Sequence, residues 1–515
     1  MMGQVMRLTT VAHRTKASTP QYFIRGVGAF FIGHKNWVHG MKNTNAMNNP
    51  VQTPDLSRRK FLKTGGLAFG GATLLSGTPP WLRTGAWAGE GGGLEKTKLT
   101  LGFIPLTDCA PLVVAAEKGY FKKYGLDVAL SKEASWANIR DKVAIGELDG
   151  AHMLAGMPIA ASLGVGALPK ATITAFSMDL NGNAITVSND LYERMEKADP
   201  EAMKERPLSA RALKKVIDAD KAAGKEPMTF AMVFPVSTHN YEIRYWMGSA
   251  GIDPDQDVRL IVIPPPQMVA NLKAGNIVGY CVGEPWNERA VEAGIGRTLI
   301  TNYEIWNNNP EKVFGVNLEW HEKNPRTHQA LIMALLEATQ WMDQPKNRME
   351  VVGLIAQKSY VNAPDEVVKM SMTGTFKYAK DEEPRPLPDF NVFYRYAANF
   401  PWLSHAAWFI SQMYRWGQLE QPANILQTAG SIYRPDLYRQ AAKALGVPYP
   451  TIDVKKEGIN AKPWTLKEAT SPIAMGPDRF FDGGVFDPAK SGEYVTGFSV
   501  KNLKVTPEAL LKANS

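Results

Sequence analysis

Apolar and polar residues follow one another in the same order in two separate stretches of the chain. In the stretch 263–287, IPPPQMVANLKAGNIVGYCVGEPWN, apolar residues at helical spacing predict a helix that ends near Gly275. The apolar run 277–282 then predicts a buried strand, and a turn carrying Glu284 and Trp286 comes after it. This stretch therefore predicts a strand end, a helix, a strand and a turn.

An earlier stretch has the same plan. A strand is predicted over 126–131, a helix opens at Ser135 and ends at Gly146, and a second strand runs over 148–154. Both helix-to-strand turns have the pattern G-x-[I/L]-x-G, GELDG in the first copy and GNIVG in the second. Two such units, well apart in one chain, predict an α/β protein with two similar lobes.

The rest of the chain after residue 97 also alternates between strand and helix patterns. Strands are predicted over 98–104, 171–178, 184–187, 228–233 and 297–301, and helices over 108–124, 158–163, 189–225, 237–248 and 324–357. In open α/β sheets, ligands bind beyond the carboxyl ends of the strands. His152 and Glu284 each stand at such an end, which makes both candidate site residues.

The first 88 residues differ in character from the rest of the chain. Residues 1–56 are polar and predict a disordered extension or an over-long gene model, while 57–88 hold SRRKFLK, a weakly apolar glycine-rich run and Ala86-Trp87-Ala88. This order is typical of a twin-arginine export signal, and the alternative is a basic linker that happens to contain Arg-Arg. We expect the mature protein to be soluble, exported folded by the twin-arginine machinery, and periplasmic.

Charge and cysteine content narrow the functional classes. The net charge of +8 comes from the leader: residues 1–88 hold 11 basic residues and one acidic residue, and the rest holds 47 basic and 49 acidic residues, a net charge of −2. Nucleic-acid binding needs a basic footprint, so no nucleic-acid partner is expected. Cys109 and Cys281 are the two cysteines, which excludes a disulfide framework and leaves a single bridge open but not favoured.

The last quarter of the chain is rich in aromatic residues. An acidic, proline-rich segment near 381–389 predicts a linker or boundary, and the tail 390–515 comes after it. Its aromatic residues are at helical spacing, which predicts core packing and not a binding stripe; they are Tyr394, Phe400, Trp402, Trp408, Tyr414 and Trp416.

Six long motifs in order carry a resemblance to a known family. They are SWANIRDK (135–142), NGNAITVS (181–188), PPPQMVANLKAG (264–275), CVGEPWNERA (281–290), NNNPEKVFG (307–315) and FPWLSHAAWFISQMYRWGQ (400–418). The chain resembles, over roughly residues 97–490, the nitrate- and bicarbonate-binding proteins of bacterial ABC importers.

This resemblance implies a type II periplasmic binding protein, an α/β two-lobed clamshell with a C-terminal helical extension. The anion-binding domain would cover 97–385, with the second lobe at about 188–285, and the extension 386–515 would pack on the lobes. Such a protein closes on nitrate or a similar small oxyanion and delivers it to a membrane permease with its ATPase. The family is not one of enzymes and needs no cofactor.

Trp136 and His152 are the candidate ligand contacts in the first lobe. Trp136 comes directly after Ser135, a good helix N-cap, and its indole N–H and ring suit a planar anion. The matching tryptophan contacts ligand in the family, while a core tryptophan is the alternative. His152 could donate a hydrogen bond to the anion, or it could be a buried structural histidine.

Two polar pairs complete the candidate set from either side of the lobe boundary. Asn181 and Gly182 belong to a turn that offers amides and exposed backbone, and turn chemistry alone explains them equally well. Ser237 and Thr238 open a second-lobe helix and could present N–H groups across the cleft, although N-capping is an equal alternative.

Glu284 is the residue that conflicts with a plain nitrate site. A carboxylate beside a bound anion is repulsive, so it must be protonated, paired with a cation or bound to a metal. In the bicarbonate-binding branch of the family a glutamate near this motif works with calcium, whereas the nitrate-binding branch has a lysine at the comparable place. Glu284 is therefore a metal ligand only if bicarbonate binds, and calcium is a cofactor only in that case; an ion pair at the hinge is its structural alternative.

Nitrate or nitrite is the preferred ligand, because the motif set resembles nitrate importers most broadly. Calcium-assisted bicarbonate or cyanate binding is the alternative within the same class, and a cytoplasmic nitrate sensor for a regulator is another. An enzyme with Cys281 as nucleophile and His152 or His239 as base is a further hypothesis, but nothing in the local sequence favours it over packing.

Overall fold

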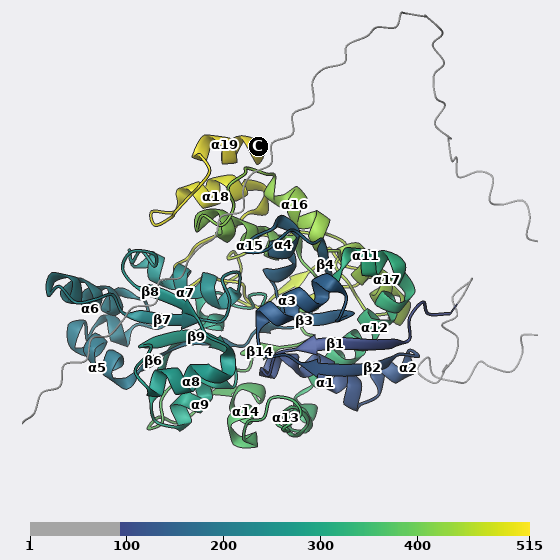
Figure 1. Ribbon diagram of the computed structural model, residues 1–515, viewed down its shortest axis with the longest axis horizontal. Coiled ribbons are helices and arrows are strands. Elements are labelled where there is room, and N and C mark those ends of the chain that lie inside the picture. The colour runs from purple at the N-terminus through teal and green to yellow at the C-terminus, as the bar shows by residue number, and fades with distance from the viewer. Residues whose placement is uncertain (1–92) are drawn as a thin grey trace, which may run out of the picture. The chain divides into compact units, whose positions relative to one another are not determined.

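The computed structural model describes residues 93–515, which belong to one compact unit (Figure 1). The predicted extension 1–56 and the predicted export signal 57–88 lie outside the described residues. Within the described part, no helix is long and apolar enough to cross a membrane.

The first lobe is built on a five-stranded sheet with the order β2-β1-β3-β11-β4. Its strands are β1 (Lys98–Phe103), β2 (Asp127–Lys132), β3 (Gly150–Leu154), β4 (Thr172–Ser177) and β11 (Lys312–Asn317). Strand β1 pairs in parallel with β2 and β3, while β11 runs antiparallel to β3 and β4. The carboxyl ends of β1, β2 and β3 therefore meet at one edge, where the sequence places the candidate site.

The second lobe repeats this plan with the order β8-β7-β9-β6-β10. Its strands are β6 (Asn183–Ser188), β7 (Thr229–Met232), β8 (Arg259–Val262), β9 (Gly279–Gly283) and β10 (Gly296–Thr301). Strand β7 is parallel to β8 and β9, and β6 runs antiparallel to β9 and β10. Each strand of one sheet thus has a counterpart in the other, and the predicted pair of similar lobes is confirmed.

The repeated G-x-[I/L]-x-G pattern has the same physical cause in both lobes. Gly146 and Gly275 come after their helices with φ angles of 79° and 74°, in the left-handed region that favours glycine. The second glycine of each pattern lies under a neighbouring side chain. A Cβ on Gly150 would stand 2.6 Å from Phe314 Cζ, and one on Gly279 would stand 2.8 Å from Val187 Cγ1.

Helices cover the faces of both sheets (Figure 1). The first lobe carries α1 (Ala110–Glu117), α2 (Tyr120–Lys123), α3 (Trp136–Ile145), α4 (Met157–Leu163), α11 (Leu318–Lys323), α12 (Pro325–Met342) and α13 (Arg348–Ile355). The second lobe carries α5 (Asn189–Ala198), α6 (Arg211–Ala222), α7 (Thr238–Ser249), α8 (Met268–Lys273), α9 (Trp286–Glu292), α10 (Asn302–Ile305) and, packed on α9, α14 (Asp365–Met372). Single 3-10 turns span Thr107–Cys109, Ala202–Lys204, Pro265–Gln267, Pro345–Asn347 and Pro488–Lys490.

Several features differ from the sequence-based expectation. The helical stretch predicted over 189–225 is divided into α5 and α6, and the one over 324–357 into α12 and α13. The helix predicted over 108–124 is split into α1 and α2 at Gly119, which has a φ of 77°. Trp286 begins helix α9, so the predicted turn is confined to the residues before it. The strand β11 is not predicted at all, because its polar approach NNNPEK breaks the apolar pattern.

The tail forms the extension of the fold. Its helices are α15 (Leu403–Arg415), α16 (Ile425–Ile432), α17 (Pro435–Leu445), α18 (Ser491–Gly497) and α19 (Pro507–Ala513). Short strand pairs join β12 (Thr375–Phe376) to β13 (Arg385–Pro386), β14 (Asn391–Val392) to β5 (Leu180–Asn181), and β15 (Trp464–Leu466) to β16 (Ile473–Met475). Five of the six aromatic residues are buried as predicted, and Tyr394 is half-buried; the five are Phe400, Trp402, Trp408, Tyr414 and Trp416.

Candidate functional site

A buried cluster of charges lies where the first sheet meets the second lobe. Lys312, the first residue of β11, is fully buried, and its Nζ lies 2.7 Å from Asp108 Oδ2. The same ammonium forms an ion pair with Glu311, which is also fully buried. A buried charge is tolerated only when partners compensate for the loss of water, and here two carboxylates hold one cation.

His152 joins this cluster from the middle of β3, and not from the strand end that the sequence predicts. Its Nε2 lies 2.8 Å from Asp108 Oδ1, and its Nδ1 accepts a hydrogen bond from the backbone N–H of Ile104 at 3.4 Å. Burial lowers the pKa of His152, against the pull of Asp108, so the ring is neutral. Burial alone would raise the pKa of Asp108, but Lys312 and His152 together hold it well below its usual range.

Trp136 covers this cluster from α3. The Ser135 side chain caps the helix by accepting a hydrogen bond from the Asn138 N–H at 3.2 Å, which fixes the position of the next residue. The Trp136 ring lies 5.7 Å from Lys312 Nζ and 5.3 Å from the His152 ring, measured to the ring centres. Its buried indole N–H has no hydrogen-bond partner in the described structure. A buried donor without a partner is costly, which favours a ligand at this place.

The second lobe contributes His239, in the first turn of α7. Its Nε2 lies 3.3 Å from Glu311 Oε1, and neither ring nitrogen makes a hydrogen bond within the described structure. Burial lowers the pKa of His239 to about 4, although the nearby Glu311 acts in the opposite direction. The ring is therefore neutral at pH 7 and can gain a proton if negative charge is added beside it.

Two further buried carboxyl groups flank the cluster. Burial raises the pKa of Asp179 well above its ordinary value, and the charge of Asp108 adds to this effect. Burial also raises the pKa of Glu242 well above its ordinary value, and Glu311 contributes. Both shifts favour the neutral forms of these carboxyl groups, which limits the negative charge around Lys312.

The arrangement offers a small anion what it needs in a dry site. Lys312 supplies a cation, and Trp136 and His239 supply donors that nothing else occupies in the described structure. Because Lys312 already has two carboxylate partners, an added anion leaves an excess of negative charge. A proton taken up by His239 would restore the balance.

Asn181 and Gly182 lie in the turn that connects the two lobes. Asn181 has a φ of 63°; its Nδ2 donates to the carbonyl of Asp389 at 2.6 Å, and its Oδ1 accepts from the N–H of Asn309 at 3.1 Å. The carbonyl of Gly182 accepts a hydrogen bond from the Glu284 N–H at 3.1 Å. The Asn181 side chain is thus already engaged by its neighbours.

Ser237 and Thr238 are likewise engaged locally. Ser237 Oγ accepts from the Asn240 N–H at 3.0 Å as the N-cap of α7 and donates to the Phe234 carbonyl at 2.7 Å. Thr238 Oγ1 donates to the Pro310 carbonyl at 3.5 Å. The side chain that this helix start sends toward Lys312 is that of the next residue, His239.

Glu284 lies beside a second carboxyl group at the contact between the lobes. Its Oε2 accepts a hydrogen bond from the Glu288 N–H at 3.2 Å, and its backbone carbonyl accepts one from the Thr107 N–H at 2.8 Å. Burial raises the pKa of Glu284 to about 8 and that of Glu288 well above its ordinary value. Among residues 93–515, no group of three or more His, Cys, Asp or Glu side chains is arranged to hold a metal ion.

The sequence did not point to three members of the cluster, which are Asp108, Glu311 and Lys312. A signal does exist for the last two: a charged pair stands directly before the apolar run VFGV. Charged residues directly before the apolar residues of a buried strand are unusual and indicate an internal ion pair or a ligand site.

Cys109 and Cys281 are free and buried, so no disulfide joins them. Burial raises the pKa of Cys281 well above its ordinary value, and Glu242 and Glu311 add to this. A thiol held in its neutral form is a poor nucleophile. Cys281 therefore behaves as the small buried hydrophobe that the sequence predicts.

The fold and this site define a class of protein. Residues 92–356 match the NMT1-like family, and the chain belongs to that family. A solved structure, the periplasmic nitrate-binding protein NrtA from Synechocystis PCC 6803, has a TM-score of 0.69 and 32% sequence identity, covering 80% of this chain and 100% of that one. The fold is therefore the two-lobed periplasmic binding protein fold.

Curated relatives place the chain more narrowly. It is 34% identical to the nitrate/nitrite binding protein NrtA of Nostoc sp., covering 87% of this chain and 99% of that protein. It is 41% identical to the nitrate import ATP-binding protein NrtC of Synechocystis sp. and 40% identical to the bicarbonate transport ATP-binding protein CmpC of the same organism. The chain spans 57% and 55% of the lengths of these two proteins.

Proposed function

We propose that this chain is the substrate-binding protein of an ABC importer and that it captures nitrate or nitrite between its lobes. One observation carries the proposal: the buried Lys312 ammonium lies under the Trp136 ring, beside two buried donors that have no partner in the described structure. Donors of this kind, contributed by both lobes, suit a planar oxyanion that is held by hydrogen bonds in the absence of water. The similarity to NrtA along nearly its whole length supports this ligand class.

Binding without catalysis is part of the proposal. The relatives of full matching length are named binding proteins, and both thiols are buried with raised pKa values. The captured anion would be passed to a membrane permease driven by an ATPase. The similarity to NrtC and CmpC supports an importer of this kind as the partner.

Calcium-assisted bicarbonate binding is the second candidate, supported by the similarity to CmpC and by the carboxyl pair of Glu284 and Glu288. In that case Glu284 would bind calcium, at the oxygen–calcium distances of roughly 2.3–2.6 Å that this ion prefers. In the nitrate case Glu284 lies outside the ligand contacts and stays protonated.

Calorimetric titration of residues 89–515 separates these ligands. We expect heat of binding with nitrate or nitrite, unchanged by a calcium chelator. Because His239 would take up a proton with the anion, affinity should rise as the pH falls from 7 toward about 4, and His239→Gln should remove this rise. Bicarbonate becomes protonated over this range and would show the opposite trend. Binding of bicarbonate alone, abolished by chelation, would overturn the nitrate assignment.

We further propose that the protein works in the periplasm after twin-arginine export. The support is the order of Arg58-Arg59, the weakly apolar run and Ala86-Trp87-Ala88 in the leader. Replacing both Arg58 and Arg59 by Lys should leave the precursor in the cytoplasm, as measured by fractionation and immunoblotting. Mature protein at unchanged periplasmic level would contradict this route.

A further inference from the structure

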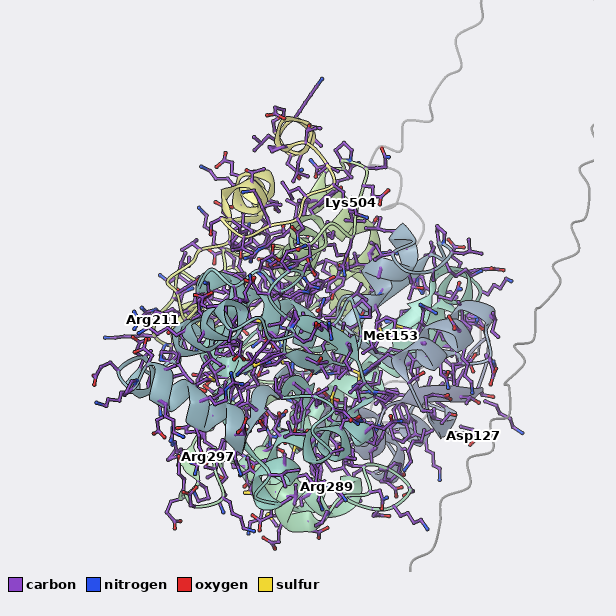
Figure 2. The ribbon with its side chains drawn as sticks, turned by 60° about the vertical axis from the view of Figure 1, so that its left-hand side comes forward. Asp127, Met153, Arg211, Arg289, Arg297 and Lys504 are labelled. Atoms are coloured by element: carbon purple, nitrogen blue, oxygen red, sulfur yellow. The ribbon has the colours of Figure 1, made fainter. Side chains whose placement is uncertain are left out.

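A basic cavity of about 520 Å³ opens at one edge of the boundary between the lobes. The first lobe lines it with Pro105 and Lys132, and the second lobe lines it with Lys273, Trp286 and Arg289. None of the described residues that line it is acidic. Arg289 lies at the lower edge of the molecule, on α9 (Figure 2).

The charges of this cavity are not neutralised by neighbours. Lys273 and Arg289 are exposed, and neither forms an ion pair within residues 93–515. The Arg289 guanidinium lies 5.5 Å from the centre of the Trp286 ring, which supports it without cancelling its charge. Since residues 89–515 carry a net charge of −2, this basic cavity is a local feature of an otherwise slightly acidic protein.

Few bonds join the lobes at this edge. The Trp286 indole N–H donates to the Pro105 carbonyl at 3.2 Å, and the Glu284 carbonyl accepts from the Thr107 N–H at 2.8 Å and from the Thr107 hydroxyl at 3.3 Å. These contacts link the segment after β1 to the segment after β9. Because β1 corresponds to β7 and β3 corresponds to β9 in the two lobes, this contact has a counterpart. In the counterpart, the segment after β3 meets the segment after β7.

The extension covers that counterpart edge and holds both lobes there. Tyr433 Oη donates to the carbonyl of Ala155 in the first lobe at 2.8 Å, and Gln418 Nε2 donates to the carbonyl of Pro235 in the second lobe at 2.8 Å. Helices α15, α16 and α18 lie at the top of the molecule, while α8 and α9 lie at the bottom (Figure 1). In the second view, Lys504 of the extension again lies near the top and Arg289 of the cavity near the bottom (Figure 2).

We propose that the basic cavity is the entry site for small inorganic anions and that the cleft opens only at this edge. The proposal rests on the function proposed above and adds a route to it. Opening here breaks these three hydrogen bonds and exposes the buried cluster, while the extension keeps the other edge closed. Cations on both rims concentrate anions at the opening and raise the rate of association.

Stopped-flow measurement of tryptophan fluorescence on mixing with nitrate tests whether the cations of the cavity raise the association rate. In the double variant Lys273→Glu/Arg289→Glu, the association rate constant should fall by about tenfold or more at low salt, and the difference should shrink as salt is added. The matched control is Lys443→Glu/Lys462→Glu, which makes the same change in net charge on exposed residues of the extension. An equal loss in both double variants would overturn the proposal.

A bulky side chain placed in the basic cavity tests whether anions enter through it. Ala270 is exposed and lines the cavity, so Ala270→Trp should slow association and dissociation by the same factor and leave the dissociation constant for nitrate unchanged. A route affects rates and not the equilibrium, whereas damage to the site would change the equilibrium. The control is Ala293→Trp, at an exposed position just after α9. Unchanged rates in Ala270→Trp would overturn the entry site, while a wild-type protein that binds no nitrate would overturn the proposed function instead.

Discussion

The side chains of the buried cluster differ in whether they have an ion-pair or hydrogen-bond partner. Lys312 forms an ion pair with Asp108, and His152 Nε2 lies 2.8 Å from the same carboxylate. The Trp136 N–H and both His239 nitrogens have no hydrogen-bond partner in the described structure. Because an unmet buried donor costs about 1–3 kcal/mol, these residues would gain most from the proposed binding of an anion. The effect of a substitution here depends on whether it removes a donor or a packing surface.

The two roles of Trp136 can be separated by substitution. Trp136→Phe keeps an aromatic ring over Lys312 and removes the N–H, so we expect nitrate affinity to fall by about 1–3 kcal/mol with little change in thermal stability. Trp136→Ala should lose the same hydrogen bond and also destabilise the fold, since a large side chain is removed from the core. Calorimetry and thermal unfolding check both effects. Nitrate affinity that is unchanged in Trp136→Phe would assign Trp136 to packing alone.

Glu284 gives a prediction about stability and pH. Its folded pKa of about 8 lies above the value of roughly 4.3 for an unfolded glutamate, so the folded protein holds this proton to higher pH. The free energy of unfolding therefore falls as pH rises from roughly 4.3 to about 8. Glu284→Gln stays neutral and should be more stable than the wild type at pH 8.5, by on the order of 1–3 kcal/mol, with the difference lost at pH 4.

Urea unfolding at both pH values measures this effect, and Glu322→Gln, at an exposed position, is the control. A difference of the same size at pH 4 and pH 8.5 would show that Glu284 acts through packing and not through its proton.

At the scale of elements, the sequence predicts what local patterns encode. The paired strand-helix-strand units and their glycines are visible because apolar spacing and left-handed turns are local properties. The strand β11 is not, because it is defined by its antiparallel neighbours β3 and β4, which lie far away in the chain. Lys312 at its start was missed for the same reason. Trp136 and His152 could be named as candidates from the sequence, because Trp136 follows a recognisable helix cap and His152 lies in a recognisable strand.

The two glycines of the first repeat should respond differently to substitution. Gly146→Ala meets no atom within 4 Å but must adopt a φ of 79°, so we expect a loss of stability of about 1 kcal/mol. Gly150→Val must displace Phe314 and Val316 across the sheet and should cost more, about 2 kcal/mol or above. Chemical unfolding gives both values, and the reverse order would contradict the packing argument.

At the scale of the whole molecule, one cluster is completed by residues of both lobes, so the proposed binding of an anion there would require the lobes to close. The chain crosses the boundary in the segments before β6 and before β11, and the extension packs on both lobes in a shared core. The lobes can therefore separate only as far as these connections allow. A change at a contact between lobes, outside the ligand cluster, should weaken binding through closure alone.

Gly156, after β3, provides this test. A Cβ at this position would collide with the carbonyl oxygen of Val236 in the second lobe, which is backbone and cannot rotate away. Gly156→Ala should wedge the lobes apart at the edge that the extension covers, so that they cannot close fully at the opposite edge and nitrate affinity falls at least tenfold, while the lobes themselves stay folded. Small-angle scattering should show the wild type contracting on nitrate binding and the variant contracting less. Gly353→Ala, within α13 and with no atom inside 4 Å, should contract like the wild type. Full contraction and full affinity in Gly156→Ala would mean that the bound state does not need this close contact, and the clamshell would have to close in another way.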